Sequence, residues 1–150
     1  MNLTSTLVPQ AKPIKVRQPL ILLVESNEDD RLRLGEWLEG AGYSLMDCPG
    51  PKRGDFTCLG IRGQSCALVE IADLAILDGR VLLEASTDRK AATRLLRYYL
   101  ASDKPVLVLA EGTDADFSFE DDRVAIATRV NRTSVVEAVR ELLELDTQAA

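Results

Sequence analysis

A short strand that leads directly into an amphipathic helix is the feature that most constrains the fold of this chain. The strand, Leu20 to Val24, is apolar throughout, and a run without alternation is typical of a parallel strand covered on both faces. A polar turn follows, in which Asn27 can cap the helix, and Gly40 and Gly42 end it. Apolar residues at the helical period predict the inner face of this helix: Leu34, Trp37, Leu38 and Ala41.

The alternation of strand and helix continues along the chain. Further strands are predicted at residues 43–47, 74–77, 105–110 and 124–128. Helices are predicted at 66–72, capped by Ser65, at 87–101, and after a capping box formed by Ser134 and Glu137. Five strands alternating with helices indicate an α/β protein with a doubly wound, five-stranded parallel sheet. The flavodoxin-like strand order 2-1-3-4-5 is the natural choice for such a sheet.

Apolar residues also predict the buried faces of the two later helices. The helix at 87–101 would bury four residues: Ala92, Leu95, Leu96 and Tyr99. The last helix would bury five: Val135, Val136, Val139, Leu142 and Leu143.

Two segments interrupt the regular pattern. Residues 48–64 contain two prolines and four glycines, which forbid a long helix and indicate an irregular insertion after the second strand. Residues 111–123 are acidic and lack a helical stripe, so we expect a reduced fourth helix. The expected organisation is a flexible arm at 1–18, one domain at 19–146 and a short tail at 147–150.

Composition excludes several classes of function. The 150 residues carry a net charge of -6, which opposes nucleic-acid binding, and no apolar run is long enough to cross a bilayer. Histidine is absent, which removes Ser/His and Cys/His catalysis and every metal site that contains histidine. We therefore expect a cytoplasmic, stand-alone domain that is not an enzyme and does not bind membranes or nucleic acid.

Two carboxylates stand where open α/β sheets place their sites. Glu25 follows the first strand and Asp78 the third, and these strands are neighbours in the expected order, so both carboxylates should meet at one edge of the sheet. Together with the oxygen-rich turn at Ser26 they suit a hard cation such as Mg²⁺, and Arg129 could stabilise a phosphoryl group there. The alternative is that these residues only cap the turns that follow their strands.

Four stretches of the sequence carry a resemblance to a known family. The opening, ILLVESNEDDRLRLGEWLEGAGY, closely resembles that of bacterial response-regulator receiver domains. Similarly, DLAILD resembles their third strand, PVLVLA their fourth, and RVNRTSVVEAVRELLE their final turn and helix. The resemblance covers Leu20 to Leu145 with one long interruption. It implies a protein of a two-component or phosphorelay system.

The resemblance also implies roles for individual residues. Asp78 matches the phosphoacceptor, whose carboxylate attacks the phosphorus of a phosphohistidine or a small phosphodonor and forms an acyl phosphate. Glu25 and Ser26 match the acidic pair that binds Mg²⁺, and the backbone carbonyl of Arg80 matches a further metal ligand. Because a hydroxyl is a poorer Mg²⁺ ligand than a carboxylate, Ser26 predicts weak metal binding.

Further departures affect the positions that contact the phosphoryl group. Ala110 stands where the family has a hydroxyl, Arg129 replaces a lysine, Val130 replaces the proline after it, and Ile126 replaces the switch aromatic. These departures favour an atypical, degenerate receiver with weak or absent phosphorylation and a protein-interaction role. Its implied partners are a sensor histidine kinase or another signalling protein, and a homodimer is a further option. A receiver fully phosphorylatable at Asp78 is the alternative.

The three cysteines lie in or beside the insertion. Cys48, Cys58 and Cys66 could form a thiolate metal site or contain a redox pair, which would make the protein a redox or metal sensor. The alternative is that they are small apolar residues in a packing layer.

Overall fold

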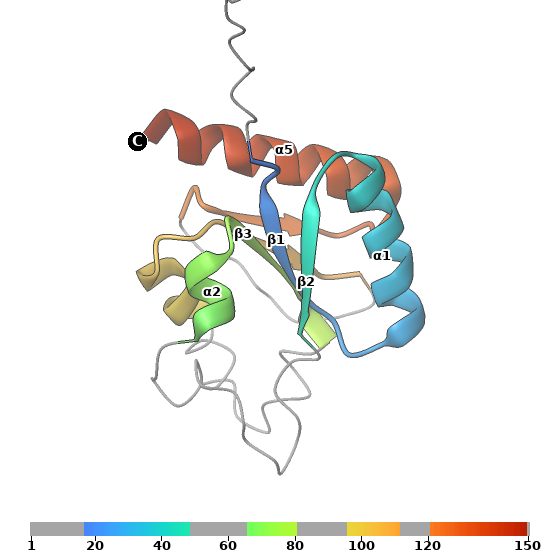
Figure 1. Ribbon diagram of the computed structural model, residues 1–150. Helices are drawn as coiled ribbons and strands as arrows, with labels where there is room; N and C mark the ends of the chain where they lie inside the picture. The colour runs from blue at the N-terminus through green and yellow to red at the C-terminus, as the bar shows by residue number, and fades with distance from the viewer. Residues whose placement is uncertain (1–16, 49–65, 81–95, 112–120, 150) are drawn as a thin grey trace, which may run out of the picture.

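A computed structural model describes residues 17–48, 66–80, 96–111 and 121–149 of the chain. It contains a five-stranded parallel sheet of order β2-β1-β3-β4-β5 (Figure 1), which confirms the predicted flavodoxin-like topology. Along the chain the strands are β1 (Leu20–Val24), β2 (Ser44–Cys48), β3 (Leu74–Asp78), β4 (Val106–Leu109) and β5 (Val124–Ala127). The helices that lie wholly within these ranges are α1 (Glu28–Gly40), α2 (Ala67–Ile71) and α5 (Arg132–Ala149).

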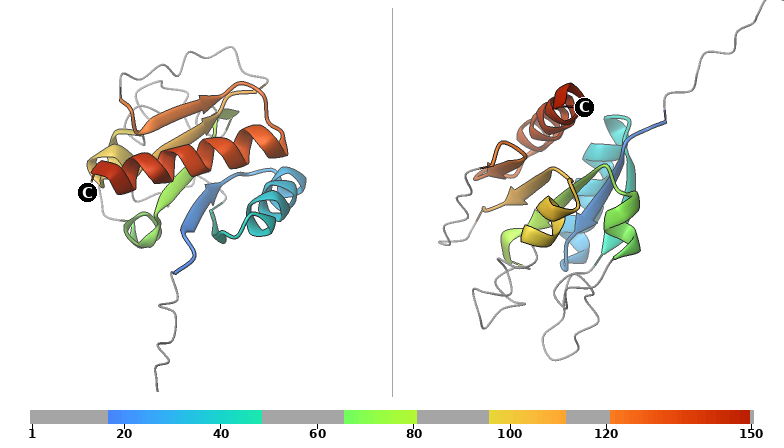
Figure 2. Two further views of the ribbon diagram at one scale, coloured as in Figure 1. Left: turned by 90° about the horizontal axis from the view of Figure 1, so that it is seen from above. Right: turned by 90° about the vertical axis from the view of Figure 1, so that its left-hand side faces the viewer.

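Each face of the sheet has its own hydrophobic cluster. On one face, side chains of the sheet pack with Leu34 and Leu38 of α1 and with Val135 and Val139 of α5. On the other, they pack with α2 and with the helical residues 96–101. The two further views in Figure 2 show these helices on opposite sides of the sheet.

The two-sided core explains the uninterrupted apolar sequence of β1. Successive side chains of a strand point to opposite faces, and here Ile21 and Leu23 belong to one cluster while Leu22 and Val24 belong to the other. All four are 1% exposed or less. The absence of alternation in β1 therefore reflects burial on both faces, as predicted.

Helix α1 begins and ends close to the predicted places. Asn27 is its N-cap and accepts a hydrogen bond from the backbone N–H of Asp30 at 3.0 Å. After the last helical residue, Gly42 has a positive φ of 97°, a conformation that glycine adopts without strain. Two positions on the expected inner face differ. Ala41 is exposed because it lies beyond the helix as its C-cap, and Trp37 is only partly buried.

Two predicted helix caps were wrong. Cys66 takes the N-cap position of α2 that we assigned to Ser65, and its side chain makes no capping hydrogen bond. Helix α5 begins two residues before Ser134, and the side chain of Asn131 accepts a hydrogen bond from the backbone N–H of Ser134 at 2.9 Å. Asn131 is thus the capping residue, and Glu137 is exposed. The prediction failed because both an Asn and a Ser at this turn can cap.

Several predictions concern residues outside the described ranges. The insertion at 49–65, most of the helix predicted at 87–101 and the segment 112–120 are among them. Within the described part, Leu96 and Tyr99 are buried as predicted. Helix α5 continues to Ala149, past the domain end expected at 146.

The last two residues of the predicted arm contact the domain. Arg17 forms hydrogen bonds with both carboxylate oxygens of Asp73 at 2.8 Å. Gln18 accepts a hydrogen bond from the hydroxyl of Ser44 at 3.0 Å. Residues 17 and 18 are thus attached at the N-terminal ends of the strands.

Candidate functional site

Strand pairing brings the two predicted carboxylates together. Strands β1 and β3 are parallel neighbours with Val24 opposite Leu77, so Glu25 and Asp78 leave the sheet side by side. Glu25 is 1% exposed and Asp78 is 3% exposed. A buried carboxylate is costly unless it is protonated or paired with a donor or a cation, so the surroundings of these two side chains determine their chemistry.

The turn after β1 adds a third carboxylate. Glu25 accepts a hydrogen bond from the backbone N–H of Asn27 at 3.0 Å, and α1 begins at the next residue. Each of three residues, Glu25, Asp30 and Asp78, offers one carboxylate oxygen, and these three oxygens lie within 4.8 Å of one another. The sequence had predicted no site role for Asp30. Its helical position places it above the strand ends, whereas Glu28 and Asp29 are exposed.

The guanidinium of Arg80 forms hydrogen bonds with two of these carboxylates, those of Asp30 and Asp78. Its Nη2 donates to Asp78 Oδ2 at 2.7 Å and to Asp30 Oδ2 at 2.8 Å. Its Nε lies 3.2 Å from each oxygen of Asp78. The backbone N–H of Arg80 also donates to Asp78 Oδ1 at 2.8 Å. The family resemblance implied a role for the backbone carbonyl of Arg80, whereas the hydrogen bonds seen here come from its N–H and its side chain.

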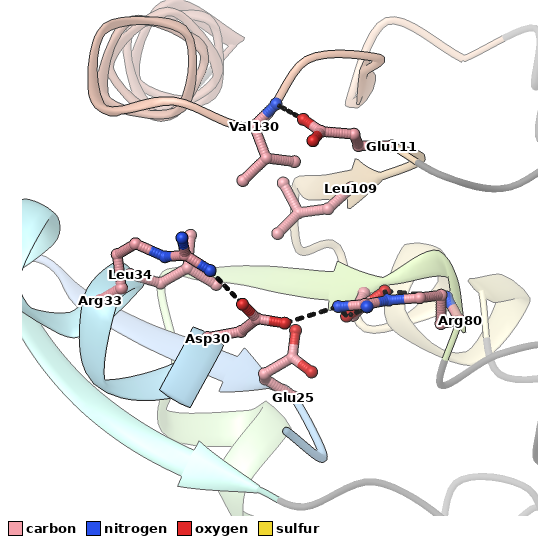
Figure 3. Close-up of a pocket in the computed structure, with 9 residues that line it drawn as sticks. Glu25, Asp30, Arg33, Leu34, Arg80, Leu109, Glu111 and Val130 are labelled. Carbon is pink, nitrogen blue, oxygen red and sulfur yellow. Dashed lines mark hydrogen bonds and ion pairs between the residues drawn. The ribbon is translucent and has the colours of Figure 1, made fainter. Parts of the chain in front are cut away.

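A second arginine covers the outer side of Asp30. Arg33, one turn further along α1, forms a salt bridge with Asp30 Oδ1. Figure 3 shows Asp30 between Arg33 and Arg80, with dashed lines to both. The guanidinium carbon of Arg33 lies 6.0 Å from the centre of the Trp37 ring, within the range of a cation–π contact. Trp37 is therefore linked to the site through Arg33.

Burial and neighbours shift the acidities of the two buried carboxyl groups in opposite directions. Burial above all, and then the hydrogen bond with Asp78, raise the pKa of Glu25 from 4.5 to about 8. For Asp78, burial alone would raise the pKa, but hydrogen bonds from Glu25 and Arg80 outweigh burial and lower it. The pKa of Arg80 is raised by its bonds to Asp78 and Asp30. At neutral pH, Glu25 is thus protonated and Asp78 is ionised against Arg80.

The far wall of the pocket comes from the end of β4 and from the loops after β4 and β5. Leu109 and Val130 line it, together with Glu111. The carboxylate of Glu111 accepts a hydrogen bond from the backbone N–H of Val130, which connects the loop after β4 to the loop after β5 (Figure 3). A proline at position 130 would have no N–H to donate, so this contact depends on a departure seen in the sequence.

The structure separates the predicted site residues into two groups. Glu25, Asp78 and Arg80 line the pocket. Four other predicted positions lie within the described residues but do not line it: Ser26, Ala110, Ile126 and Arg129. Ser26 and Arg129 are exposed, and Ile126 is 38% exposed. Within the described ranges, the cations that reach the carboxylates are therefore Arg33 and Arg80.

Two cysteines of the suggested thiol site lie in the described part of the chain. Cys48 and Cys66 are partly buried and pack against the core cluster that contains Val69. This packing agrees with the reading of these two residues as small apolar side chains. Cys58 lies outside the described residues.

The carboxylate oxygens favour Mg²⁺ binding, whereas the hydrogen bonds that they already accept oppose it. Three carboxylates with oxygens this close are the ligands that a hard cation prefers, and they could hold a metal ion. However, Arg80 donates to both oxygens of Asp78 and to one of Asp30. With Arg80 in this position, a metal ion does not fit on the two aspartates.

Among the described residues, no helix is both long and apolar enough to span a membrane. No protein-family model matches the sequence, and no curated protein matches it.

Solved structures share the fold at low sequence identity. A CheY-like response-regulator receiver domain from Methanospirillum hungatei is 18% identical, with a TM-score of 0.54 over 89% of this chain and 100% of that one. The N-terminal domain of a response regulator/sensory box/GGDEF protein from Carboxydothermus hydrogenoformans is 16% identical, with a TM-score of 0.55 over 87% and 98%.

A third structure holds a metal. The receiver domain of a sensor histidine kinase from Pseudomonas aeruginosa, with a magnesium ion coordinated in its active-site cleft, is 18% identical, with a TM-score of 0.55 over 85% of this chain and 99% of that one. Strand order and these likenesses agree: the chain has the fold of response-regulator receiver domains.

Proposed function

We propose that the chain is a cytoplasmic, non-catalytic receiver-like signalling module that acts through contacts with other proteins and whose Asp78 is phosphorylated weakly or not at all. Its partners would be a sensor histidine kinase or another signalling protein. Mg²⁺ would bind weakly at Glu25, Asp30 and Asp78.

The contact between Arg80 and Asp78 carries this proposal. A carboxylate that attacks phosphorus needs an available lone pair on the attacking oxygen. Both oxygens of Asp78 already accept hydrogen bonds from Arg80. These bonds, together with that from Glu25, lower the pKa of Asp78, and a less basic oxygen is a poorer nucleophile. Attack would require Arg80 to move away first.

The surroundings of the pocket support the same proposal. Ala110, which follows β4, has no hydroxyl to contact a phosphoryl group. Glu111 adds a further carboxylate to the pocket wall, and like charge repels a phosphoryl group. In addition, Arg129 is exposed and does not line the pocket. An acyl phosphate on Asp78 would thus meet more negative charge and fewer donors than phosphoryl stabilisation requires.

Intact-mass measurement after incubation with acetyl phosphate and Mg²⁺ tests the proposal. We expect the mass of the full chain to stay unchanged, or a minor fraction to gain one phosphoryl group that is absent in Asp78→Ala. Circular dichroism of both proteins checks that they are folded. A wild-type protein that is mostly phosphorylated within minutes would refute the proposal.

A receiver that is fully phosphorylatable at Asp78 is the second candidate. The three carboxylate oxygens within 4.8 Å of one another favour it, because they could hold a metal ion beside Asp78. The same measurement distinguishes the two functions: complete conversion of the wild type, with none in Asp78→Ala, would support this one.

A further inference from the structure

We propose that Arg80 is the built-in cation of this acidic site, and that a divalent cation binds Glu25, Asp30 and Asp78 together only after the Arg80 side chain has left. This inference rests on the proposed function and adds a device that controls its site. The exchange involves no covalent change: a guanidinium leaves the carboxylates and a metal ion takes its place.

The hydrogen bonds around the three carboxylates leave little room for a metal. Asp78 accepts from Arg80 at both oxygens. Asp30 accepts from Arg33 at Oδ1 and from Arg80 at Oδ2. Glu25 Oε1 accepts from the backbone of Asn27. Five of the six carboxylate oxygens therefore already have a donor, and Arg80 supplies the donors for three of them.

Arg80 is suited to this position by its chemistry. A planar guanidinium can donate to two carboxylates at once, whereas an ammonium group acts as a point charge. Nη2 of Arg80 uses this property, because it donates to both Asp78 and Asp30. Arg80 thus joins the end of β3 to the first turn of α1, the two elements that a bound metal would also join.

The side chain of Arg80 can also leave without disturbing the turn. It is 48% exposed, so its route to solvent is open. The backbone N–H of Arg80 holds Asp78 Oδ1 independently of the side chain. The structure therefore permits two arrangements of one turn, one with Arg80 on the aspartates and one with Arg80 in solvent.

A competing internal cation reduces metal affinity by a predictable factor. The apparent dissociation constant is the intrinsic one divided by the fraction of molecules in the binding-competent arrangement. If Arg80 leaves the aspartates in about 1–10% of molecules, removal of its side chain tightens Mg²⁺ binding by about 10–100-fold.

Calorimetric titration of the full chain with MgCl₂ tests this inference. We compare the wild type with Arg80→Gln, which loses the cation, and with Arg33→Gln, which removes the same charge from the same pocket but no contact to Asp78. Arg17→Gln is the surface control, since Arg17 pairs with Asp73 at the other end of the strands. Thermal unfolding without Mg²⁺ verifies that each variant is folded.

The expected results separate competition by Arg80 from a general effect of charge. Arg80→Gln should bind Mg²⁺ at least about 10-fold more tightly than the wild type, Arg33→Gln should improve binding by a smaller factor, and Arg17→Gln should match the wild type. Equal improvement by Arg80→Gln and Arg33→Gln, or no improvement by Arg80→Gln, would overturn the inference. For the wild type, Arg80→Gln and Arg17→Gln, fluorescence of Trp37 offers a second readout, because Arg33 links it to Asp30.

The calorimetric titration and the phosphorylation assay can refute the two proposals independently. Efficient phosphorylation of the wild type would refute the proposed function. The inference on Arg80 depends instead on the Mg²⁺ affinities of the variants, which are measured without a phosphodonor.

Discussion

The wild-type protein should become less stable as the pH rises from mildly acidic to neutral, because Glu25 is buried. Replacement of Glu25 by Gln should abolish most of this decrease. Glu25 is 1% exposed, and its pKa rises from 4.5 to about 8 in the folded protein. The folded state therefore binds a proton that the unfolded state has released between these two values. Stability consequently falls with rising pH in this window. Gln cannot ionise, and its amide can accept from Asn27 and donate to Asp78 as the protonated carboxyl does.

The size of the effect follows from the two acidities of Glu25. For one proton, each pH unit inside the window changes the free energy of unfolding by about 1.4 kcal/mol. From about pH 5 to about pH 7, the wild type should lose roughly 2–3 kcal/mol from this residue, whereas Glu25→Gln should lose almost none of it. Because the Gln amide can keep the hydrogen bond to Asp78, the other groups should titrate alike in both proteins, and the difference between the two curves then reports on Glu25.

Urea unfolding at a series of pH values, without divalent cations, measures this difference. The free energy of unfolding of Glu25→Gln minus that of the wild type should increase steadily with pH. Glu36→Gln, an exposed position on α1, controls for the loss of one surface carboxylate. Parallel curves for Glu25→Gln and the wild type would refute the reasoning, because they would mean that Glu25 has the same acidity in both states.

Three further changes test the packing and the caps by denaturant unfolding. Leu38→Ala, at a fully buried position of α1, should cost about 2–5 kcal/mol, and a loss below about 1 kcal/mol would contradict the packing of α1 on the sheet. Asn27→Ala removes the α1 cap and should cost about 1 kcal/mol, whereas Asn27→Gly should cost only a few tenths. Arg123→Ala removes the bonds that Asp121 accepts from Nε and Nη2 and one of the two bonds that the carbonyl of Leu100 accepts. It should lower the free energy of unfolding, and an unchanged value would count against these contacts.

The fold could be predicted from the sequence because its signals are local and repeated. The apolar runs of β1, β3 and β4 indicated strands, and the structure confirms all three and buries nearly all of their residues. Errors fell at element ends, such as the cap of α5 at Asn131, where neighbouring polar residues compete for the same role. Such competition is decided by the path of the chain into the helix, which residue types alone do not specify.

The site could be predicted only in part, for a related reason. Glu25 and Asp78 were found because strand ends in a parallel sheet converge by topology. Asp30 and the Arg80 side chain were missed because their contacts depend on how a helix turn and a long side chain are oriented in space. A signal was nevertheless available: an arginine two residues after a buried aspartate is close enough for its own guanidinium to reach back.

Ser26, which replaces a carboxylate of the receiver family, and Arg80 both reduce the need for a metal ion at the acidic site. Buried negative charge is costly unless it is compensated. Here, protonated Glu25 carries no charge, and Asp30 and Asp78 form salt bridges with Arg33 and Arg80, so the chain itself compensates the three carboxyl groups. Another carboxylate at position 26 would add negative charge near these residues and favour binding of a divalent cation. Ser26 is exposed and neutral, so it adds no charge that Arg80 would have to compensate. The chain thus supplies cations to these aspartates without a metal ion, which is consistent with the proposed role as a protein-binding module.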